Sequence, residues 1–249
     1  MDVICAKDII RDAIKEPKAK IAICYWGLTR STKKVYQSHY DKLFRVLNEH
    51  QIQYDVFMHT WYIEGNQRVW WKELNVPIDY KEYVLLNPSY YQIDNQDVFT
   101  ANICLNEYTP SENLGDEWSQ PILILNLICA LESQKRVVEM ISNSQNKYDI
   151  IIYVRPDAFI HTEVPIHHIL NLEEGDIILP DCDHFLGYND RFAILRYQSG
   201  LVYGSRIDRL KEYRRSIGKI TSEKYLKYIC DTNEFRPIMV KFDFDLVRP

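Results

Sequence analysis

The chain has 249 residues, of which 46% are hydrophobic and 26% charged, and its formal net charge is -5. This composition is typical of a globular protein with a sizeable core, and it excludes collagen, disordered and low-complexity chains. A mildly acidic chain is a poor candidate for sequence-independent nucleic-acid binding, because that affinity comes mainly from phosphate neutralisation. We therefore expect no nucleic-acid partner.

Several common sequence signals are missing. No Gly-x-Gly-x-x-Gly or P-loop motif occurs, so the usual dinucleotide fold and the P-loop NTPases would lack their phosphate-binding loops. The longest apolar run, Pro121 to Leu131, is well short of the roughly 20 residues that a transmembrane helix needs. The six cysteines lie far apart without a Cys-x-x-Cys pair. This pattern predicts a cytoplasmic, reduced protein with neither a zinc site nor a disulfide framework.

A strand, a helix and a second strand follow one another in the first part of the chain. Residues 21–26 form a short apolar run that ends at Gly27, which is typical of a buried strand. Apolar residues then recur on one face of a predicted helix over 33–49. Residues 54–61 read as the second strand. This succession predicts a βαβ unit and a parallel sheet.

Residues 62–116 are less regular, with one predicted strand over 82–86. A long irregular stretch inside a compact domain is often a binding loop or lid. The pattern becomes helical over 118–142. A strand over 148–154 follows and stops at Arg155-Pro156, because proline cannot donate a hydrogen bond to a sheet.

The last third of the chain continues the alternation of strands and helices. A short strand over 176–179 precedes helices over 206–219 and 225–229, and alternating apolar residues predict a final strand over 240–246. We see no repeat, flexible linker or break in composition. We therefore expect one α/β domain over residues 1–249, with a mostly parallel central sheet flanked by helices.

Charged and aromatic residues follow several predicted strands, where open parallel sheets bind ligands. Arginine forks match phosphate oxygens and carboxylates hold hard cations, so the combination suits a phosphate ligand bridged by a divalent metal. The residues in question are Gly27, Thr29, Arg30, His59, Trp61, Arg155, Asp157, Asp181, Asp183 and His184.

The predicted metal role has competing locations. Strand alternation already explains Asp243-Phe244-Asp245, and a turn explains Asp181-Cys182-Asp183 as well as a ligand role does. Arg155-Pro156-Asp157 is favoured by its position after a strongly apolar strand, with a structural ion pair as the alternative. His59 has the alternative of a buried structural histidine. The basic helix over 206–219 is either a solvated face or a contact for an anionic membrane surface or polyanionic acceptor.

The sequence resembles the GT-A-type glycosyltransferases of a group marked by an Asn-Asp-Arg-Phe-Ala signature, found in bacteria and large viruses. The signature stands at residues 189–193, and Arg155-Pro156-Asp157 precedes it. The surrounding order also matches, from Gly27-x-x-Arg30 after the first strand to Ser222-Glu223 before the last helix. The resemblance covers about residues 18–248.

The resemblance implies transfer of a sugar from a nucleotide-sugar donor to a hydroxyl of a glycan or other acceptor, with Mn²⁺ or Mg²⁺ on the pyrophosphate. Asp157 is then the expected metal ligand. Because Arg155 replaces the first Asp of the Asp-x-Asp motif, a site of one Asp plus water, or no tightly held metal, stays open. The expected donor-binding residues are Gly27, Arg30, His59, Trp61, Arg155, Asn189 and Arg191.

An inverting transfer needs a carboxylate to accept the proton of the acceptor hydroxyl. Asp190 is the first candidate for this base, followed by Asp181 and Asp183, although Asp190 and Arg191 fit a structural clamp equally well. A retaining mechanism would need no such base. Two other classes stay open: a non-catalytic carbohydrate- or nucleotide-sugar-binding module of the same fold, and a methyltransferase or other nucleotide enzyme.

Overall fold

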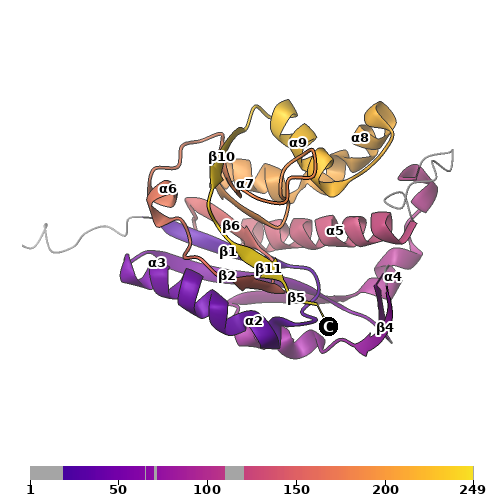
Figure 1. The fold of residues 1–249 in the computed structure, drawn as a ribbon, viewed down its shortest axis with the longest axis horizontal. Coiled ribbons are helices and arrows are strands. Elements are labelled where there is room, and N and C mark those ends of the chain that lie inside the picture. The colour runs from indigo at the N-terminus through magenta and orange to yellow at the C-terminus, as the bar shows by residue number, and fades with distance from the viewer. Residues whose placement is uncertain (1–18, 65, 70–71, 110–120, 249) are drawn as a thin grey trace, which may run out of the picture.

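The computed structural model describes residues 19–64, 66–69, 72–109 and 121–248. Its centre is a seven-stranded sheet with helices on both faces (Figure 1). Across the sheet the strands are β10 (Arg236–Val240), β8 (Asp176–Pro180), β9 (Phe192–Arg196), β6 (Ile150–Val154), β1 (Lys20–Trp26), β2 (Gln53–Tyr62) and β5 (Tyr90–Asn95).

All strands of this sheet except β9 run in one direction. β1 pairs in parallel with β2 and β6, β2 with β5, and β8 with β10, whereas β9 is antiparallel to both β6 and β8. The prediction of a mostly parallel central sheet flanked by helices is therefore confirmed. Because β9 is reversed, the residues that enter it lie at the same sheet edge as the residues that leave β6, with Phe192 opposite Val154.

Each face of the sheet carries its own helices, which lie on opposite sides of it in Figure 1. The first group is α2 (Thr32–His39), the π-helical turn η1 (Tyr40–Phe44), α3 (Arg45–Glu49) and α6 (Ile166–Leu170). The second group is α5 (Pro121–Asn143), α7 (Tyr197–Gly204), α8 (Leu210–Ile217) and α9 (Ser222–Thr232).

The central strand β1 is buried on both faces, as its uninterrupted apolar sequence predicts for a covered parallel sheet. Ile21, Ile23 and Tyr25 belong to the core on the α2 side, while Cys24 and Trp26 belong to the core on the α5 side. Packing on both faces fixes the carboxyl end of β1, and with it the loop that follows.

One predicted strand, over 82–86, is wrong, and another, over 240–246, is only partly confirmed. Residues 80–86 form the 3₁₀ helix η2 (Tyr80–Leu86), begun by Asp79, whose side chain accepts a 2.9 Å bond from the Lys81 amide. The sheet strand that follows is β5, which begins ten residues after the start of η2. The predicted strand over 240–246 is divided into β10 and β11 (Phe244–Leu246), and β11 pairs antiparallel with β7 (Ala158–Ile160).

The remaining described elements are short: β3 (Asn66–Val69), β4 (Lys72–Pro77), α4 (Gln96–Ala101), η3 (Leu105–Glu107) and η5 (Arg206–Arg209). Cys5 and residues 118–120, where a helix was predicted to begin, lie outside the described residues. Within the described part of the chain, no helix has the length and apolar character needed to cross a membrane.

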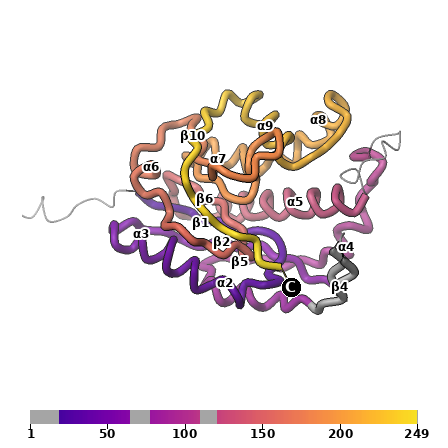
Figure 2. Tube along the Cα trace, viewed as in Figure 1, coloured from indigo at the N-terminus to yellow at the C-terminus, as the bar shows by residue number. Residues whose placement is uncertain are grey.

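The C-terminal segment runs across the molecule from β10 through β11 to the neighbourhood of α2, as the yellow tube shows (Figure 2). Beyond β11, the Val247 amide donates a 2.9 Å hydrogen bond to the carbonyl of Asp157, and the Ser31 hydroxyl donates one to the Val247 carbonyl. These bonds bring residues 247–248 beside the loops that follow β1 and β6.

Candidate active site

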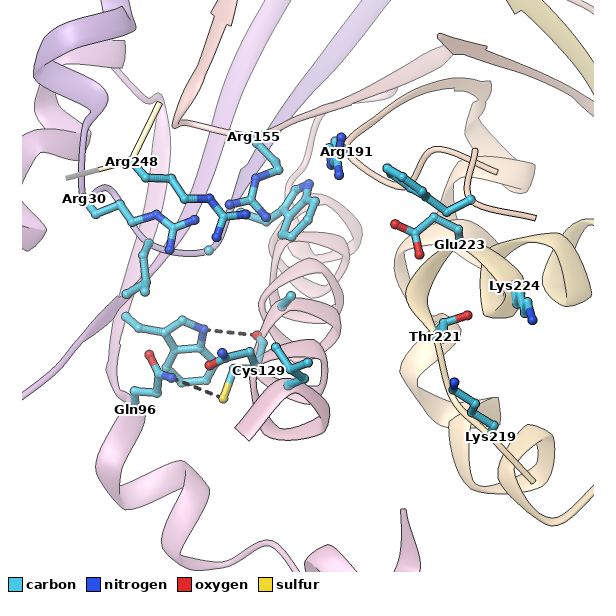
Figure 3. A pocket seen from close by; sticks show the side chains of 18 of the residues that line it. Arg30, Gln96, Cys129, Arg155, Arg191, Lys219, Thr221, Glu223, Lys224 and Arg248 are labelled. Atoms are coloured by element: carbon cyan, nitrogen blue, oxygen red, sulfur yellow. Dashed lines mark hydrogen bonds between the residues drawn. The ribbon is translucent and has the colours of Figure 1, made fainter. Parts of the chain in front are cut away.

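A cavity of about 580 Å³ lies beyond the carboxyl ends of β1 and β6 (Figure 3). An adjoining space of about 220 Å³ shares several of its lining residues and adds Asp190. This volume suits a ligand of nucleotide size. The polar and charged lining residues of the larger space are Arg30, Gln96, Asn126, Arg155, Arg191, Lys219, Thr221, Glu223, Lys224 and Arg248.

Three arginines, Arg30, Arg155 and Arg248, gather at one end of this cavity, and we call them the arginine wall (Figure 3). Behind them lies Asp157. Arg30 donates from Nε and Nη2 to Asp157 Oδ2, at 3.1 and 2.8 Å. Arg155 donates from Nε to Oδ1 at 2.8 Å and from Nη2 to Oδ2 at 2.7 Å. Both carboxylate oxygens of Asp157 are thereby engaged with arginine.

The Asp157 side chain is fully buried and does not line the cavity. Burial alone would raise its pKa, but the adjacent positive charges of Arg155 and Arg30 hold the pKa well below its usual range. The carboxylate is therefore ionised at neutral pH, and the two guanidiniums keep a fixed orientation towards the cavity.

A divalent metal at Asp157 does not fit these contacts. To bind the carboxylate, the ion would have to displace two guanidiniums from a fully buried group. In addition, no group of three or more His, Cys, Asp and Glu side chains among the described residues is placed to hold a metal ion. The predicted role of Asp157 as a metal ligand stays a prediction, and no step below depends on it.

Arg248 completes the arginine wall from the C-terminal segment. Its pKa is lowered to about 10, by burial and by the positive charges of Arg30 and Arg155. A pKa of this size still leaves the guanidinium charged at neutral pH. The backbone bonds of Val247 described above position this side chain, although it is far from the other two arginines in sequence.

The opposite wall carries a carboxylate, Glu223, in the first turn of α9 (Figure 3). Its pKa is raised, first by burial and then by the negative charge of Asp190. A carboxylate whose pKa is shifted towards neutrality is a better proton acceptor than a fully solvated one. Glu223 therefore presents to the cavity a carboxylate with an increased affinity for a proton.

A loop over residues 181–191 packs against Glu223 and closes this side of the cavity. The Tyr188 amide donates a 3.0 Å bond to the Glu223 carbonyl. A Cβ atom at Gly187 would lie 2.0 Å from the same carbonyl oxygen, so only glycine fits there. Phe185 and Leu186 have positive φ angles of 41° and 68°, and their side chains are 62% and 84% exposed while lining the cavity.

The polar signature residues largely build this loop. Asn189 is buried; its side chain donates a 3.1 Å bond to the Cys182 carbonyl and accepts a 2.9 Å bond from the Arg191 amide. Arg191 lines the cavity and pairs with Asp183. Asp190 lines the smaller space, next to Glu223. The signature thus combines a loop-forming amide with two charged residues at the cavity.

The structure brings together only some of the predicted site residues. Gly27, Arg30, Trp61, Arg155 and Arg191 line the larger space, and Asp190 lines the smaller one. Neither space includes the remaining ones: His59, Asp157, Asp181, Asp183 and Asn189. Their predicted functional roles stay predictions, and so do those of the lining residues.

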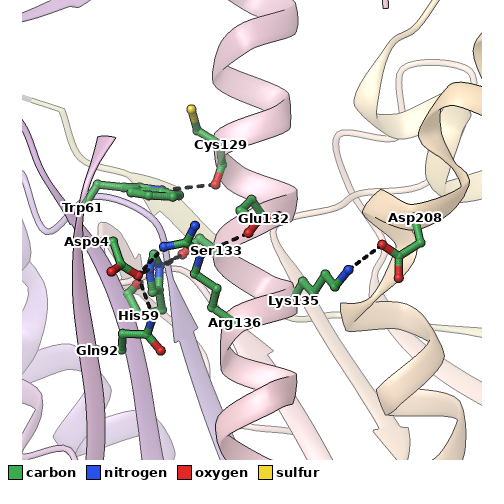
Figure 4. Close-up of polar contacts among 10 residues, drawn as sticks. All are labelled: His59, Trp61, Gln92, Asp94, Cys129, Glu132, Ser133, Lys135, Arg136 and Asp208. Carbon is green, nitrogen blue, oxygen red and sulfur yellow. Dashed lines mark hydrogen bonds and ion pairs between the residues drawn. The ribbon is translucent and has the colours of Figure 1, made fainter. Parts of the chain in front are cut away.

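His59 belongs to a buried polar network next to the cavity (Figure 4). Its Nε2 lies 3.0 Å from the Asp94 carboxylate, which also accepts hydrogen bonds from Gln92 and Arg136. Its Nδ1 lies 2.6 Å from the Ser133 hydroxyl, which accepts a 2.8 Å bond from the Gly27 amide. The network therefore ties the loop after β1 to α5.

Serine, histidine and aspartate in this order resemble a hydrolase triad, but the arrangement does not fit one. Ser133 and His59 are fully buried and do not line the cavity, so a substrate cannot reach the hydroxyl. Burial lowers the pKa of His59 to about 4, so the ring is neutral at pH 7. We assign the network a structural role beneath the cavity.

Sequence reasoning missed Glu223, Arg248 and Trp26 as lining residues. The signal for Glu223 was available, because Ser222-Glu223 stands just before the predicted helix over 225–229 and belongs to the sequence resemblance. Trp26 ends β1 and places its ring 5.3 Å from the Arg155 guanidinium, and its indole Nε1 has no hydrogen-bond partner among the described residues. Arg248 had no local signal, because only the path of the C-terminal segment brings it to the site.

Comparisons with known proteins find a similarity in structure but none in sequence. No protein-family model matches the sequence, and no curated protein matches it. Among solved structures, the chain is similar to mouse xyloside xylosyltransferase 1 in its apo form, with 10% identity and a TM-score of 0.44, over 89% of this chain and 84% of that one. A likeness at this level does not determine a family or a function.

Proposed function

We propose that the chain is a glycosyltransferase with a GT-A-like fold, which transfers a sugar from a nucleotide-sugar donor to a hydroxyl of an acceptor. The observation that carries this proposal is a cavity with a cluster of arginines on one wall and a carboxylate on the other. One wall presents Arg30, Arg155 and Arg248. The other presents Glu223, together with the cations Arg191, Lys219 and Lys224 (Figure 3). This separation suits a reaction in which a diphosphate leaves one side of a sugar while a hydroxyl attacks from the other.

The donor's diphosphate is assigned to the arginine wall. Guanidiniums bind phosphate oxygens through paired N–H donors, and they stabilise the negative charge that develops as the nucleoside diphosphate leaves. The loop after β1 starts at Gly27, whose φ angle of 93° favours glycine. Gly27 and Leu28 line the cavity beside these arginines and are placed to contact the nucleotide.

The acceptor is assigned to the side of Glu223. The acceptor oxygen attacks the anomeric carbon, Glu223 accepts the hydroxyl proton, and the bond from that carbon to the diphosphate oxygen breaks. This assignment makes the transfer inverting. Asp190 stands beside Glu223, and its negative charge raises the pKa of Glu223. We therefore propose Glu223 as the base and Asp190 as the residue that raises the pKa of this base.

A nucleotide-sugar panel tests this proposal. The protein is incubated with UDP-, GDP-, ADP-, CDP- and dTDP-sugars, with and without simple glycosides as acceptors, and nucleoside diphosphate release is measured. We expect release from at least one donor, accelerated by an acceptor. Binding of a donor without any release would instead support the non-catalytic binding module, and neither binding nor release would contradict both functions.

A further inference from the structure

We infer that the arginine wall binds the diphosphate of the donor directly, without a divalent metal ion. This inference rests on the proposed function and deepens it, because it names what neutralises the diphosphate. It departs from the Mn²⁺ or Mg²⁺ that the sequence resemblance implies. Three features of the cavity support it: the engagement of Asp157, the gathering of positive charge, and the fixed orientation of the guanidiniums.

The Asp157 carboxylate is not available to a metal ion, because it is already bonded to two arginines. Asp157 accepts four hydrogen bonds from Arg30 and Arg155 and lies behind them, away from the cavity. Those four bonds use Nε and Nη2 of each arginine. Among the described residues no hydrogen bond is made by the Nη1 group of either side chain, and both arginines line the end of the cavity where Figure 3 shows the three guanidiniums together.

The charges at this end of the cavity favour an anionic ligand. Three guanidiniums gather here, and two of them, those of Arg30 and Arg155, share the single carboxylate of Asp157. A diphosphate esterified at both ends carries one negative charge on each phosphate. A divalent cation placed here would instead be repelled by three nearby positive charges in a partly dehydrated space, where such repulsion is strong.

The orientation of Arg30 and Arg155 is set before any ligand arrives. Only 8% of the Arg30 side chain and 19% of the Arg155 side chain are exposed, and both are held by Asp157. The ring of Trp26 lies against Arg155. Pre-oriented guanidiniums lose little conformational entropy on binding, which favours direct recognition of phosphate.

The test measures binding by calorimetry in excess EDTA and again in Mn²⁺ or Mg²⁺. The probes are inorganic pyrophosphate and the nucleoside diphosphates UDP, GDP, ADP, CDP and dTDP. We expect the best nucleoside diphosphate to bind in EDTA with an affinity within about threefold of that with metal. Binding that appears only with metal, or improves tenfold or more, would overturn the inference while leaving the proposed function in place.

A charge-removing variant and a matched control locate the binding site. Arg248→Gln should weaken nucleoside diphosphate binding in EDTA by tenfold or more. Arg45→Gln removes the same charge from an exposed ion pair with Glu49 and Glu163, outside the cavity lining, and should leave affinity unchanged. Equal affinities for both variants would overturn the inference. If Arg248→Gln is unfolded at the assay temperature, the affinities of the wild-type protein in EDTA and in metal still decide whether binding needs a metal ion.

If no nucleoside diphosphate binds in either buffer, the proposed function fails together with the inference. If pyrophosphate and a nucleoside diphosphate bind in EDTA but no nucleotide sugar is consumed, the inference holds and the transferase assignment fails.

Discussion

The two walls of the cavity are built in different ways. The arginine wall stands at the ends of buried strands, and its cations are held by the fully buried Asp157 and by backbone bonds from Val247. The opposite wall consists of a loop and the start of a helix, with residues of positive φ and the exposed side chains of Phe185 and Leu186. One wall is fixed by the core, whereas the other depends on loop packing.

This contrast suggests that the two walls have different roles: the arginine wall binds the diphosphate, and the loop wall fits the acceptor. A diphosphate is common to all nucleoside-diphosphate sugars, so a rigid set of cations suffices to bind it. Acceptors vary in shape, and loops are where proteins accommodate such variation. Changes in the arginine wall should therefore affect stability and donor affinity together, while changes in the loop wall should affect transfer and leave the diphosphate site intact.

The largest expected effect is on catalysis, from Glu223→Gln. Glutamine keeps the size of the side chain but cannot accept the proton, so transfer should fall by about 10² to 10⁴-fold. Nucleoside diphosphate affinity should stay within about twofold, because the arginine wall is untouched. Glu163→Gln, an exposed change near α3, is the control. If Asp190→Asn abolishes transfer and Glu223→Gln does not, Asp190 is the base.

The next effect is on stability, from Asp157→Asn. Removing the charge between Arg30 and Arg155 leaves two buried cations unpaired, which costs about 3–5 kcal/mol. We expect a melting temperature lower by about 10 °C, since each kcal/mol corresponds to roughly 2–4 °C at this size. Asp245→Asn, in an exposed pair with His161, should change little. Normal melting with lost transfer would instead support a direct role of Asp157 at the substrate.

Lowering the pH should reduce the free energy of unfolding, because two buried histidines must then take up protons. Burial lowers the pKa values of His39 and His59 to about 4, so the unfolded chain binds protons below pH 6.5 before the folded chain does. Each histidine therefore contributes on the order of 3 kcal/mol to the free energy of unfolding above about pH 6.5. This contribution is lost as the pH falls towards 4. Urea unfolding from pH 4 to 8 measures this slope, and His59→Gln should reduce it. If His59→Gln leaves the dependence of stability on pH unchanged, the low pKa of His59 is contradicted.

A smaller effect is expected from Gly187→Ala. The added methyl would collide with the Glu223 carbonyl, so the loop must move at a cost of about 1–3 kcal/mol. Transfer should fall because Glu223 and Asp190 lose their relative positions. Pyrophosphate affinity should not change, and a parallel loss of that affinity would show that the two walls are not independent.

The smallest effect on stability should come from Leu186→Ser. The side chain is 84% exposed, so the free energy of unfolding should change by less than about 0.5 kcal/mol. If Leu186 contacts the acceptor, the KM for the acceptor rises several-fold with kcat little changed. Steady-state kinetics at fixed donor concentration measures both, and an unaltered KM would remove Leu186 from the acceptor site.

The sequence predicts the regular parts of this fold well because buried parallel strands are continuously apolar. Residues 21–26, 54–61 and 148–154 are found as β1, β2 and β6, and the helical periodicity over 33–49 is found as α2, η1 and α3. The misassigned segments are those where local pattern is ambiguous. Residues 82–86 are apolar enough for a strand, yet the cap at Asp79 begins a 3₁₀ helix there.

The candidate site was predictable where it lies at the end of an apolar strand and where the Asn-Asp-Arg-Phe-Ala signature marks it. Arg30 and Arg155 were found because each lies just beyond an apolar run. Glu223 and Arg248 depend on how distant segments pack, which periodicity does not report. The burial of Asp157 could not be inferred either, because an aspartate after a strand looks the same whether it faces a ligand or two arginines.

The reversed direction of β9 has a consequence for redesign. Since β8 and β9 are neighbours and antiparallel, the loop between Pro180 and Phe192 joins two strand ends at one edge. Only at its start, where the Asp181 amide donates a 2.8 Å bond to the Val240 carbonyl of β10, is a bond from its described residues to the sheet found. It is in effect a long hairpin connection. Its exposed tip, Phe185 and Leu186, is therefore the part open to exchange by grafting. A different acceptor specificity could be installed there without altering the register of any strand, the three arginines or the contact of Gly187 with Glu223.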